Sequence, residues 1–169
     1  DMPYGNREFT IQDNNGYVIT IAETTDMVTQ FDIHFPHNLS LETDRVQLRI
    51  LKRDDLTQLL PLTASDTTWK YFTKDLTGEV TLKAWVEEAR NDYGNQRRVP
   101  FVIIDKQQNK IAGSTSFGNI SFLDKRIEIG WSWLGDAFKG GGVNTHAKFL
   151  LMQYAFEKGF PSYITDELE

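Results

Sequence analysis

Short stretches in which hydrophobic and polar residues alternate recur along this chain, a pattern typical of β-strands with one buried face. The strands expected beyond residue 40 cover residues 44–50, 100–105, 110–117 and 126–134. Apolar residues recur with the period of an amphipathic helix after Asp54, over residues 80–93, and from Val143 onward. The order of one strand, two helices, three strands and a helix predicts an α+β or mixed α/β domain.

The beginning of the chain predicts a β-hairpin. Residues 8–12 and 17–21 alternate on either side of the pair Asn15-Gly16, and an Asn-Gly pair is a strong turn signal. Residues 4–23 resemble the closing hairpin of the vicinal oxygen chelate fold, the fold of glyoxalase and bleomycin-resistance proteins. The matching residues are Arg7-Glu8-Phe9 and Gly16-Tyr17-Val18-Ile19. Metal-dependent members of that superfamily place a glutamate where this chain has Thr20, so the resemblance implies no metal. The alternative is an extra hairpin attached to the main domain.

A boundary is expected after this hairpin. Phe31, Ile33 and Phe35 alternate with polar residues, which predicts a short strand, and residues 36–38 are typical of a break. We therefore divide the chain into an N-terminal hairpin segment with a linker, residues 1–40, and a main domain, residues 41–169. His34 and His37 have a spacing that suits a metal ion. No third ligand is near them in the sequence, so surface or packing roles are favoured.

The transition from a strand to a helix through three glycines is the strongest functional signal. A strand ending at residues 131–134 is followed by Gly140, Gly141 and Gly142, and then by a helix. Glycines leave no side chain above the backbone amides, and a helix start presents unpaired N–H groups at the positive end of its dipole. This combination predicts a phosphate or pyrophosphate site. The alternative is a merely flexible connection.

The helix after the glycines has a well-defined apolar stripe. Its members are Val143, Ala147, Leu150, Leu151 and Tyr154. Apolar side chains at positions 149, 152, 155 and 156 extend the stripe nearly all round, which predicts a largely buried helix. Gly159 is the expected stop.

Composition excludes several classes of protein. The net charge of −6 over 169 residues argues against a nucleic-acid binder, because there is no basic excess to neutralise phosphates. The absence of cysteine excludes disulfides, thiol catalysis and cysteine-ligated zinc. No apolar run approaches the ~20 residues of a membrane span, and no signal peptide is visible. A cytoplasmic location is therefore the default expectation.

The stretch around the glycines resembles the GNAT superfamily of acyl-CoA N-acyltransferases, and within it the RimJ/RimL-like branch. The similarity extends over residues 41–160 and is strongest over residues 127–134 and 138–151. The family's signature is Gln/Arg-x-x-Gly-x-Gly/Ala. Lys139 takes its first position, Gly142 its central glycine and Asn144 its last small residue. The resemblance implies a mostly antiparallel sheet flanked by helices, with acetyl-CoA as co-substrate and no metal.

The resemblance also assigns expected contacts to coenzyme A. The backbone of the strand end would hold the pantetheine arm, and the glycine loop would hold the pyrophosphate. The implied cofactor-binding residues are Trp131, Trp133, Leu134, Lys139, Gly140, Gly141, Gly142, Val143, Asn144 and Thr145. The aromatic residues Trp69, Tyr71 and Phe72 would line the acceptor cleft, and core packing is the equally plausible alternative.

Glu128 is the candidate general base that takes the proton from the acceptor amine. Strand alternation places Arg126, Glu128, Gly130 and Ser132 on one face, and Ile127, Ile129, Trp131 and Trp133 on the other. A carboxylate in an otherwise apolar strand indicates a functional or structural role, and burial would raise its pKa toward neutrality. The alternative is a structural ion pair with Arg126 or another cation.

Members of the superfamily usually continue past this helix with another strand, a helix and a final hairpin. Here we expect a C-terminally incomplete domain, whose sheet is completed by the N-terminal hairpin or by a second copy of the chain. The second possibility predicts a homodimer or a strand-exchanged oligomer. The sequence thus predicts an N-acetyltransferase for a peptide N-terminal amine or a small amine. The alternative is a non-catalytic CoA-binding or interaction module.

Overall fold

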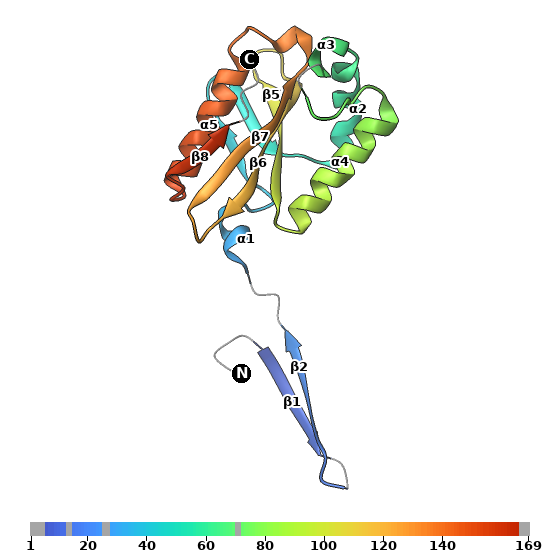
Figure 1. The fold of residues 1–169 in the computed structure, drawn as a ribbon, viewed down its shortest axis with the longest axis vertical. Helices are drawn as coiled ribbons and strands as arrows, with labels where there is room; N and C mark the ends of the chain where they lie inside the picture. The colour runs from blue at the N-terminus through green and yellow to red at the C-terminus, as the bar shows by residue number, and fades with distance from the viewer. Residues whose placement is uncertain (1–5, 13–14, 25–27, 70–71, 166–169) are drawn as a thin grey trace. The chain divides into compact units, whose positions relative to one another are not determined.

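The computed structural model describes residues 6–12, 15–24, 28–69 and 72–165, which form two compact units, residues 1–33 and 34–169. The first unit contains strands β1 (Asn6–Gln12) and β2 (Val18–Thr24), which pair antiparallel as a two-stranded sheet (Figure 1). The predicted hairpin is confirmed, although Asp13 and Asn14 of its turn lie outside the described residues. Within the described residues β1 and β2 form a two-stranded sheet of their own. Completion of the main sheet by this hairpin stays a prediction.

The strand predicted around Phe31, Ile33 and Phe35 is wrong, because the short helix α1 (Gln30–His34) occupies this segment. The cause is a reciprocal cap at its start. The Oδ2 atom of Asp32 accepts bonds from the Thr29 amide at 3.0 Å and hydroxyl at 2.7 Å, and the Asp32 amide donates back to the Thr29 hydroxyl. Such local bonds favour a helix start over an extended segment.

The second unit is built on a six-stranded sheet in the order β3-β4-β5-β6-β7-β8. Neighbouring strands are antiparallel from β3 to β7, and β8 joins β7 in parallel. The strands are β3 (Ser40–Glu42), β4 (Val46–Ile50), β5 (Arg98–Asp105), β6 (Lys110–Ser121), β7 (Arg126–Leu134) and β8 (Ser162–Thr165). The predicted strands β4 to β7 and the mixed α+β class are confirmed, whereas β8 was not predicted.

Helices cover both faces of this sheet, with α5 on one side and α2, α3 and α4 on the other (Figure 1). The α5 side carries one long helix, α5 (Val143–Glu157). The other side carries η1 (Arg53–Asp55), α2 (Leu56–Leu59), η2 (Leu60–Thr63), α3 (Asp66–Trp69) and α4 (Glu79–Gly94), and the short η3 (Asp136–Phe138) precedes the glycine loop. None of the helices in the described residues is long and apolar enough to cross a membrane.

The core on the α5 side confirms most of the predicted stripe. Val143, Ala147, Leu150, Leu151 and Tyr154 are all buried. Two further apolar positions of the helix, Phe149 and Phe156, are 53% and 51% exposed, so the expectation of burial nearly all round is wrong for them. Gly159 has φ of 85°, and its amide bonds the Phe156 carbonyl, which confirms it as the helix stop.

The core on the α4 side contains an aromatic cluster. Trp69 packs edge-on against Trp133 at 5.4 Å between ring centroids, and Trp85 against Trp133 at 6.1 Å. Trp69 is 6% exposed and Phe72 packs against the same cluster, so these two predicted acceptor-wall aromatics belong to the core. Tyr71, the third of them, lies outside the described residues.

Candidate functional site

Strand β7 contains a β-bulge at Trp131. The pairing with β6 jumps from Ser116–Gly130 to Ser114–Trp133, and Trp131 has φ of 53°, in the left-handed region. An extra residue in one strand interrupts the two-residue alternation of side chains. The faces of β7 therefore exchange at this point.

The bulge overturns part of the predicted face assignment. Ile129 pairs with Phe117, which stacks on Tyr154 of α5, so Ile129 faces α5. Trp131 lies on the opposite face from Ile127 and Ile129, because its ring covers Gly118, the partner of Glu128. Ser132 faces α5 instead of sharing the face of Glu128.

Beyond Ile129, one edge of β7 has no strand partner among the described residues, and we call it the open edge. Strand β8 pairs with β7 only from Arg126 to Ile129, and residues 130–134 have no strand partner on that side within the described part of the chain. Their other edge pairs with β6 at Gly113 and Ser114. Open backbone N–H and C=O groups can accept an extended amide-containing chain as an added strand.

The glycine loop follows directly and has the conformation that glycine permits. Gly140 and Gly142 have φ of 73° and 80°. A methyl group at either position would meet no atom within 4 Å, so the space above the loop is open. Gly142 is the N-cap of α5 and offers no capping side chain, which leaves first-turn amides of the helix directed at this space. The loop has the shape of an anion cradle at a helix N-terminus.

Arg45 stands beside this cradle, and sequence analysis did not single it out. Its Nη2 atom lies 3.9 Å from the position that a Cβ of Gly141 would take. The Nη1 atom is bonded to the carboxylate of Asp105, a fully buried residue at the end of β5. Because 60 residues separate the two partners, no local pattern could have revealed this arrangement.

Lys139 is engaged differently from what the signature implies. Its ammonium donates to Oδ1 of Asp136 at 2.6 Å and to the hydroxyl of Thr68 at 2.8 Å. The bond from Lys139, followed by bonds from Ser65 and others, lowers the pKa of Asp136. Lys139, the residue before Gly140, therefore links the start of the loop to α3.

His146 completes the polar surroundings of the helix start. Its Nδ1 atom is 3.0 Å from the hydroxyl of Thr43 and 4.0 Å from a carboxylate oxygen of Asp44. Its amide donates to the Gly142 carbonyl and so closes the first turn of α5.

The remaining predicted contacts divide into backbone and side-chain candidates. Trp133, Leu134 and Val143 are buried at 5%, 8% and 1% exposure, so they can offer only backbone groups to a ligand. Asn144 and Thr145 are exposed in the first turn of α5. The structure thus brings together the end of β7, the glycine loop and the first turn of α5.

Glu128 lies at the other end of β7 and is half-buried. Its Oε2 atom accepts a hydrogen bond from the side-chain amide of Asn119. The alternative of a structural ion pair with Arg126 does not occur within the described residues, where Glu128 bonds to Asn119. Glu128 shares its face of the sheet with Trp131.

Arg98 is a buried cation that packs against Trp131, the bulge residue. It is 2% exposed, its Nε donates to the hydroxyl of Ser116 at 2.9 Å, and its guanidinium carbon lies 5.0 Å from the ring centroid of Trp85 and 4.8 Å from that of Trp131. Its Nη2 atom has no hydrogen-bond partner within the described residues. Burial lowers the pKa of Arg98 to about 10. This buried cation was not predicted, because Arg97-Arg98 resembles an ordinary polar turn before a strand.

Comparison with known families adds an independent observation. Residues 45–166 match the family described as an acetyltransferase (GNAT) domain, which is more than half of the chain. No curated protein sequence matches the chain.

Solved structures with the same fold include three acetyltransferases. The chain is similar to a GCN5-related N-acetyltransferase from Brucella melitensis (23% identity, TM-score 0.65, covering 74% of this chain and 57% of that one). It is similar to an acetyltransferase of the GNAT family from Bacillus anthracis (18%, 0.58, 71% and 68%). It also resembles an acetyltransferase from Salmonella typhimurium that modifies the N-terminal serine of ribosomal protein L7/L12 (21%, 0.61, 72% and 70%).

These similarities establish the fold, and the chain spans only 57% of the length of the Brucella melitensis protein. The match over residues 45–166 covers β4 to β8, the bulge and the glycine loop. The chain belongs to the GNAT acetyltransferase family.

Proposed function

We propose that this protein is an N-acetyltransferase that transfers an acetyl group from acetyl-CoA to a primary amine, either the N-terminal amine of a peptide or a small amine. The observation that carries the proposal is the continuity of an open β7 edge with an unobstructed glycine cradle. One extended donor can then bind along both. The similarity to an enzyme that acetylates an N-terminal serine is consistent with a peptide acceptor.

The diphosphate of coenzyme A would bind at the glycine loop. Open space above Gly140 and Gly142 admits phosphate oxygens to the backbone amides, which a Cβ at either position would obstruct. Arg45 contributes a guanidinium that is already oriented by Asp105. Exposed Asn144 and Thr145 extend the same donor surface along the first turn of α5.

The pantetheine arm would lie along residues 130–134 of β7. Its two amide groups match the spacing of strand hydrogen bonds, so the open edge can hold it in the manner of an added strand. A backbone N–H near the bulge would then stabilise the oxyanion that forms when the amine nitrogen attacks the thioester carbonyl. The C–N bond of the amide forms, the C–S bond of the thioester breaks, and coenzyme A leaves as its thiolate.

Glu128 would accept the proton that the amine loses. It is the carboxylate on β7, it shares its face with Trp131 at the bulge, and Asn119 orients it. Half-burial keeps it in contact with solvent, so the proton can be released after each turnover. The alternative function is a CoA-binding module without turnover.

The deciding experiment is calorimetric titration of the chain with acetyl-CoA, followed by release of free thiol in the presence of an amine panel. We expect binding, and thiol release with at least one peptide or small amine. Binding without thiol release across the panel would favour the non-catalytic module. Absence of binding at millimolar acetyl-CoA would overturn both functions.

A further inference from the structure

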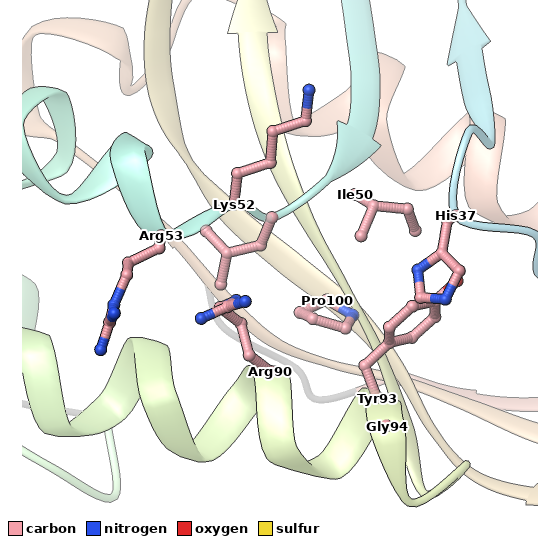
Figure 2. A pocket seen from close by; sticks show the side chains of 9 residues that line it. His37, Ile50, Lys52, Arg53, Arg90, Tyr93, Gly94 and Pro100 are labelled. Carbon is pink, nitrogen blue, oxygen red and sulfur yellow. The ribbon is translucent and has the colours of Figure 1, made fainter.

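We propose that a second pocket, at the C-terminal end of α4, binds a small organic carboxylate with an apolar body. The pocket has a volume of about 340 Å³ and lies between the last turn of α4, the end of β4 and the start of η1. Figure 2 shows Lys52, Arg53 and Arg90 on one side of Pro100, with His37 and Tyr93 on the other. No part of the proposed acetyl transfer uses this pocket.

The floor of the pocket is apolar. Ile50, Leu51 and Tyr93 line it and are only 7%, 3% and 8% exposed. The amide of Leu51 donates to the carbonyl of Pro100 at 2.9 Å, so the backbone polar groups at the base are paired. The hydroxyl of Tyr93 donates to the Phe35 carbonyl at 2.6 Å, which leaves the ring as an apolar wall. A ligand that reaches this floor gains by removing apolar surface from water.

The rim of the pocket is cationic. Lys52, Arg53 and Arg90 line it and carry three positive charges. Glu87 is the counter-charge, at 2.7 Å from Arg53 and 3.5 Å from Arg90. Lys52 has no ion-pair partner for its ammonium in the described part of the chain. Asp54 and Asp55 of η1 also lie next to Lys52 and Arg53 in the chain, and Asp55 pairs with Arg49. Four cations against three carboxylates leave one positive charge in excess in a chain whose net charge is −6, and a local excess of this kind attracts anions.

The negative end of the α4 dipole opposes this attraction only in part. A helix C-terminus ordinarily presents unpaired carbonyl groups with partial negative charge. Here the amide of Asn95 bonds the carbonyl of Asn91, and the amide of Gln96 bonds that of Tyr93. His37 stands edge-on to the Tyr93 ring at 4.9 Å between centroids and offers a further ring N–H at the mouth.

These features together select the ligand. The planar guanidinium of Arg90 matches a carboxylate in geometry and charge, and the floor accepts a ring or short aliphatic chain. A purely inorganic anion would leave the apolar floor unused, and an apolar molecule would leave the cations unpaired.

The pocket is separate from the glycine cradle. Arg45, beside the cradle, precedes the first residue of β4, whereas Ile50, in the pocket, is the last. Five residues of extended strand correspond to about 17 Å. The two sites therefore lie at opposite ends of strand β4, and this proposal stands independently of the proposed activity.

The experiment is a titration of isotope-labelled protein with 3-phenylpropionate, followed by two-dimensional NMR of the backbone amides. We expect shifts at Leu51, Lys52 and Gly94, with affinity about tenfold higher than for propionate or for 3-phenylpropanol. The variant Arg90→Gln should bind about tenfold more weakly. The control Arg97→Gln removes a guanidinium that is 66% exposed, pairs with Asp92 and does not line the pocket, so its affinity should be unchanged.

Equal affinity for propionate and 3-phenylpropionate would mean that only the carboxylate is recognised. Equal affinity for 3-phenylpropanol and 3-phenylpropionate would mean that only the apolar body is recognised. Either result overturns the proposal, as would shifts confined to other parts of the chain. If Arg90→Gln fails to fold, Lys52→Gln takes its place, because the side chain of Lys52 is exposed. Titration with acetyl-CoA in parallel reports on the other site, so failure of one is distinguishable from failure of the other.

Discussion

The guanidinium of Arg98 lies against the indole of Trp131, with 4.8 Å between the guanidinium carbon and the ring centroid. The ring centroid of Trp85 in α4 is 5.0 Å from the same guanidinium carbon, so the cation contacts two aromatic rings. The same Trp131 is the bulge residue with φ of 53°. A strained backbone conformation persists only where surrounding contacts over-determine it, and this stack supplies such contacts.

Replacing Arg98 by Met should raise the free energy of unfolding by about 1–3 kcal/mol. The burial that lowers the pKa of Arg98 to about 10 is a cost of keeping the charge in the folded state. Met fills a similar volume without that cost, although it loses the cation–π contacts and the bond to Ser116. Urea unfolding checks the change, and a loss of more than 1 kcal/mol would contradict it.

The pH dependence of the stability of wild type and of Arg98→Met follows from the linkage between folding and protonation of Arg98. Above about pH 10 the folded chain loses the Arg98 proton while the unfolded chain still holds it, so stability rises with pH there. Below pH 10 both states are protonated and the cost is constant. We therefore expect the difference between wild type and Arg98→Met to be the same from pH 6 to 9. A difference that changes across this range would point to another titrating group.

Much of the fold follows from sequence periodicity, because β4 to β7, α4 and α5 have regular alternation or a regular apolar stripe. The errors have local physical causes. The cap between Thr29 and Asp32 turned an alternating segment into a helix, and one extra residue at Trp131 exchanged the faces of β7. Neither the cap nor the bulge changes the hydrophobic periodicity of the sequence, so neither could be predicted from that periodicity.

Gly118 should be intolerant of a side chain because of Trp131. A Cβ at this position would lie 2.3 Å from the indole. Gly118→Ala therefore forces the ring off Arg98 and should destabilise the fold by about 1–3 kcal/mol. Thermal or urea unfolding measures this. In the double variant Gly118→Ala with Trp131→Ala, the glycine substitution should cost far less, and an undiminished cost would locate the clash elsewhere.

Gly142→Ala tests whether the glycine loop binds the diphosphate, and Gly78→Ala is its control. Gly142 and Gly78 are both N-cap glycines with positive φ, 80° and 90°, and neither has an atom within 4 Å of its missing Cβ. Gly142 has ψ of −5°, in the left-handed helical region, where alanine costs about 1–2 kcal/mol. Gly78 has ψ of 158°, in a region that almost only glycine populates, so alanine there carries at least as much backbone strain. Only Gly142→Ala places a methyl group beside the proposed diphosphate. We expect it to weaken acetyl-CoA binding about tenfold or more by calorimetry. An equal loss in Gly78→Ala would mean that strain alone is responsible.

Glu128→Gln tests the proposed base. The amide keeps the shape and the contact with Asn119 but cannot accept the proton, so turnover should fall ~10²-fold or more. Glu42→Gln is the control, because Glu42 is an exposed strand carboxylate that pairs with Lys106. The pH–rate profile is the decisive measurement. If the limb assigned to a base is unchanged in Glu128→Gln, another group or a water chain removes the proton.

Local sequence identified the glycine loop but not the residues that surround it. Arg45, just before β4, lies beside the loop and is bonded to Asp105 of β5, and this proximity depends on strand register. His146 of α5 contacts Thr43 near the same end of β4. The pairing of Val46 with Asp105 places the two ends side by side. A single sequence contains no signal for such a long-range pairing, so the electrostatic part of the site emerged only from the folded chain.

The predicted homodimer or strand-exchanged oligomer can be tested against acetyl-CoA. Strand β8 covers the first half of β7 and leaves residues 130–134 as its open edge on that side in the described structure. A strand of a second chain would pair there, at the place proposed for the pantetheine arm. Acetyl-CoA and a partner chain would then compete, so light scattering should show the oligomer dissociating as acetyl-CoA is added. Gly142→Ala should require about tenfold more ligand for the same effect. An oligomer that persists at saturating acetyl-CoA must be held together by another surface.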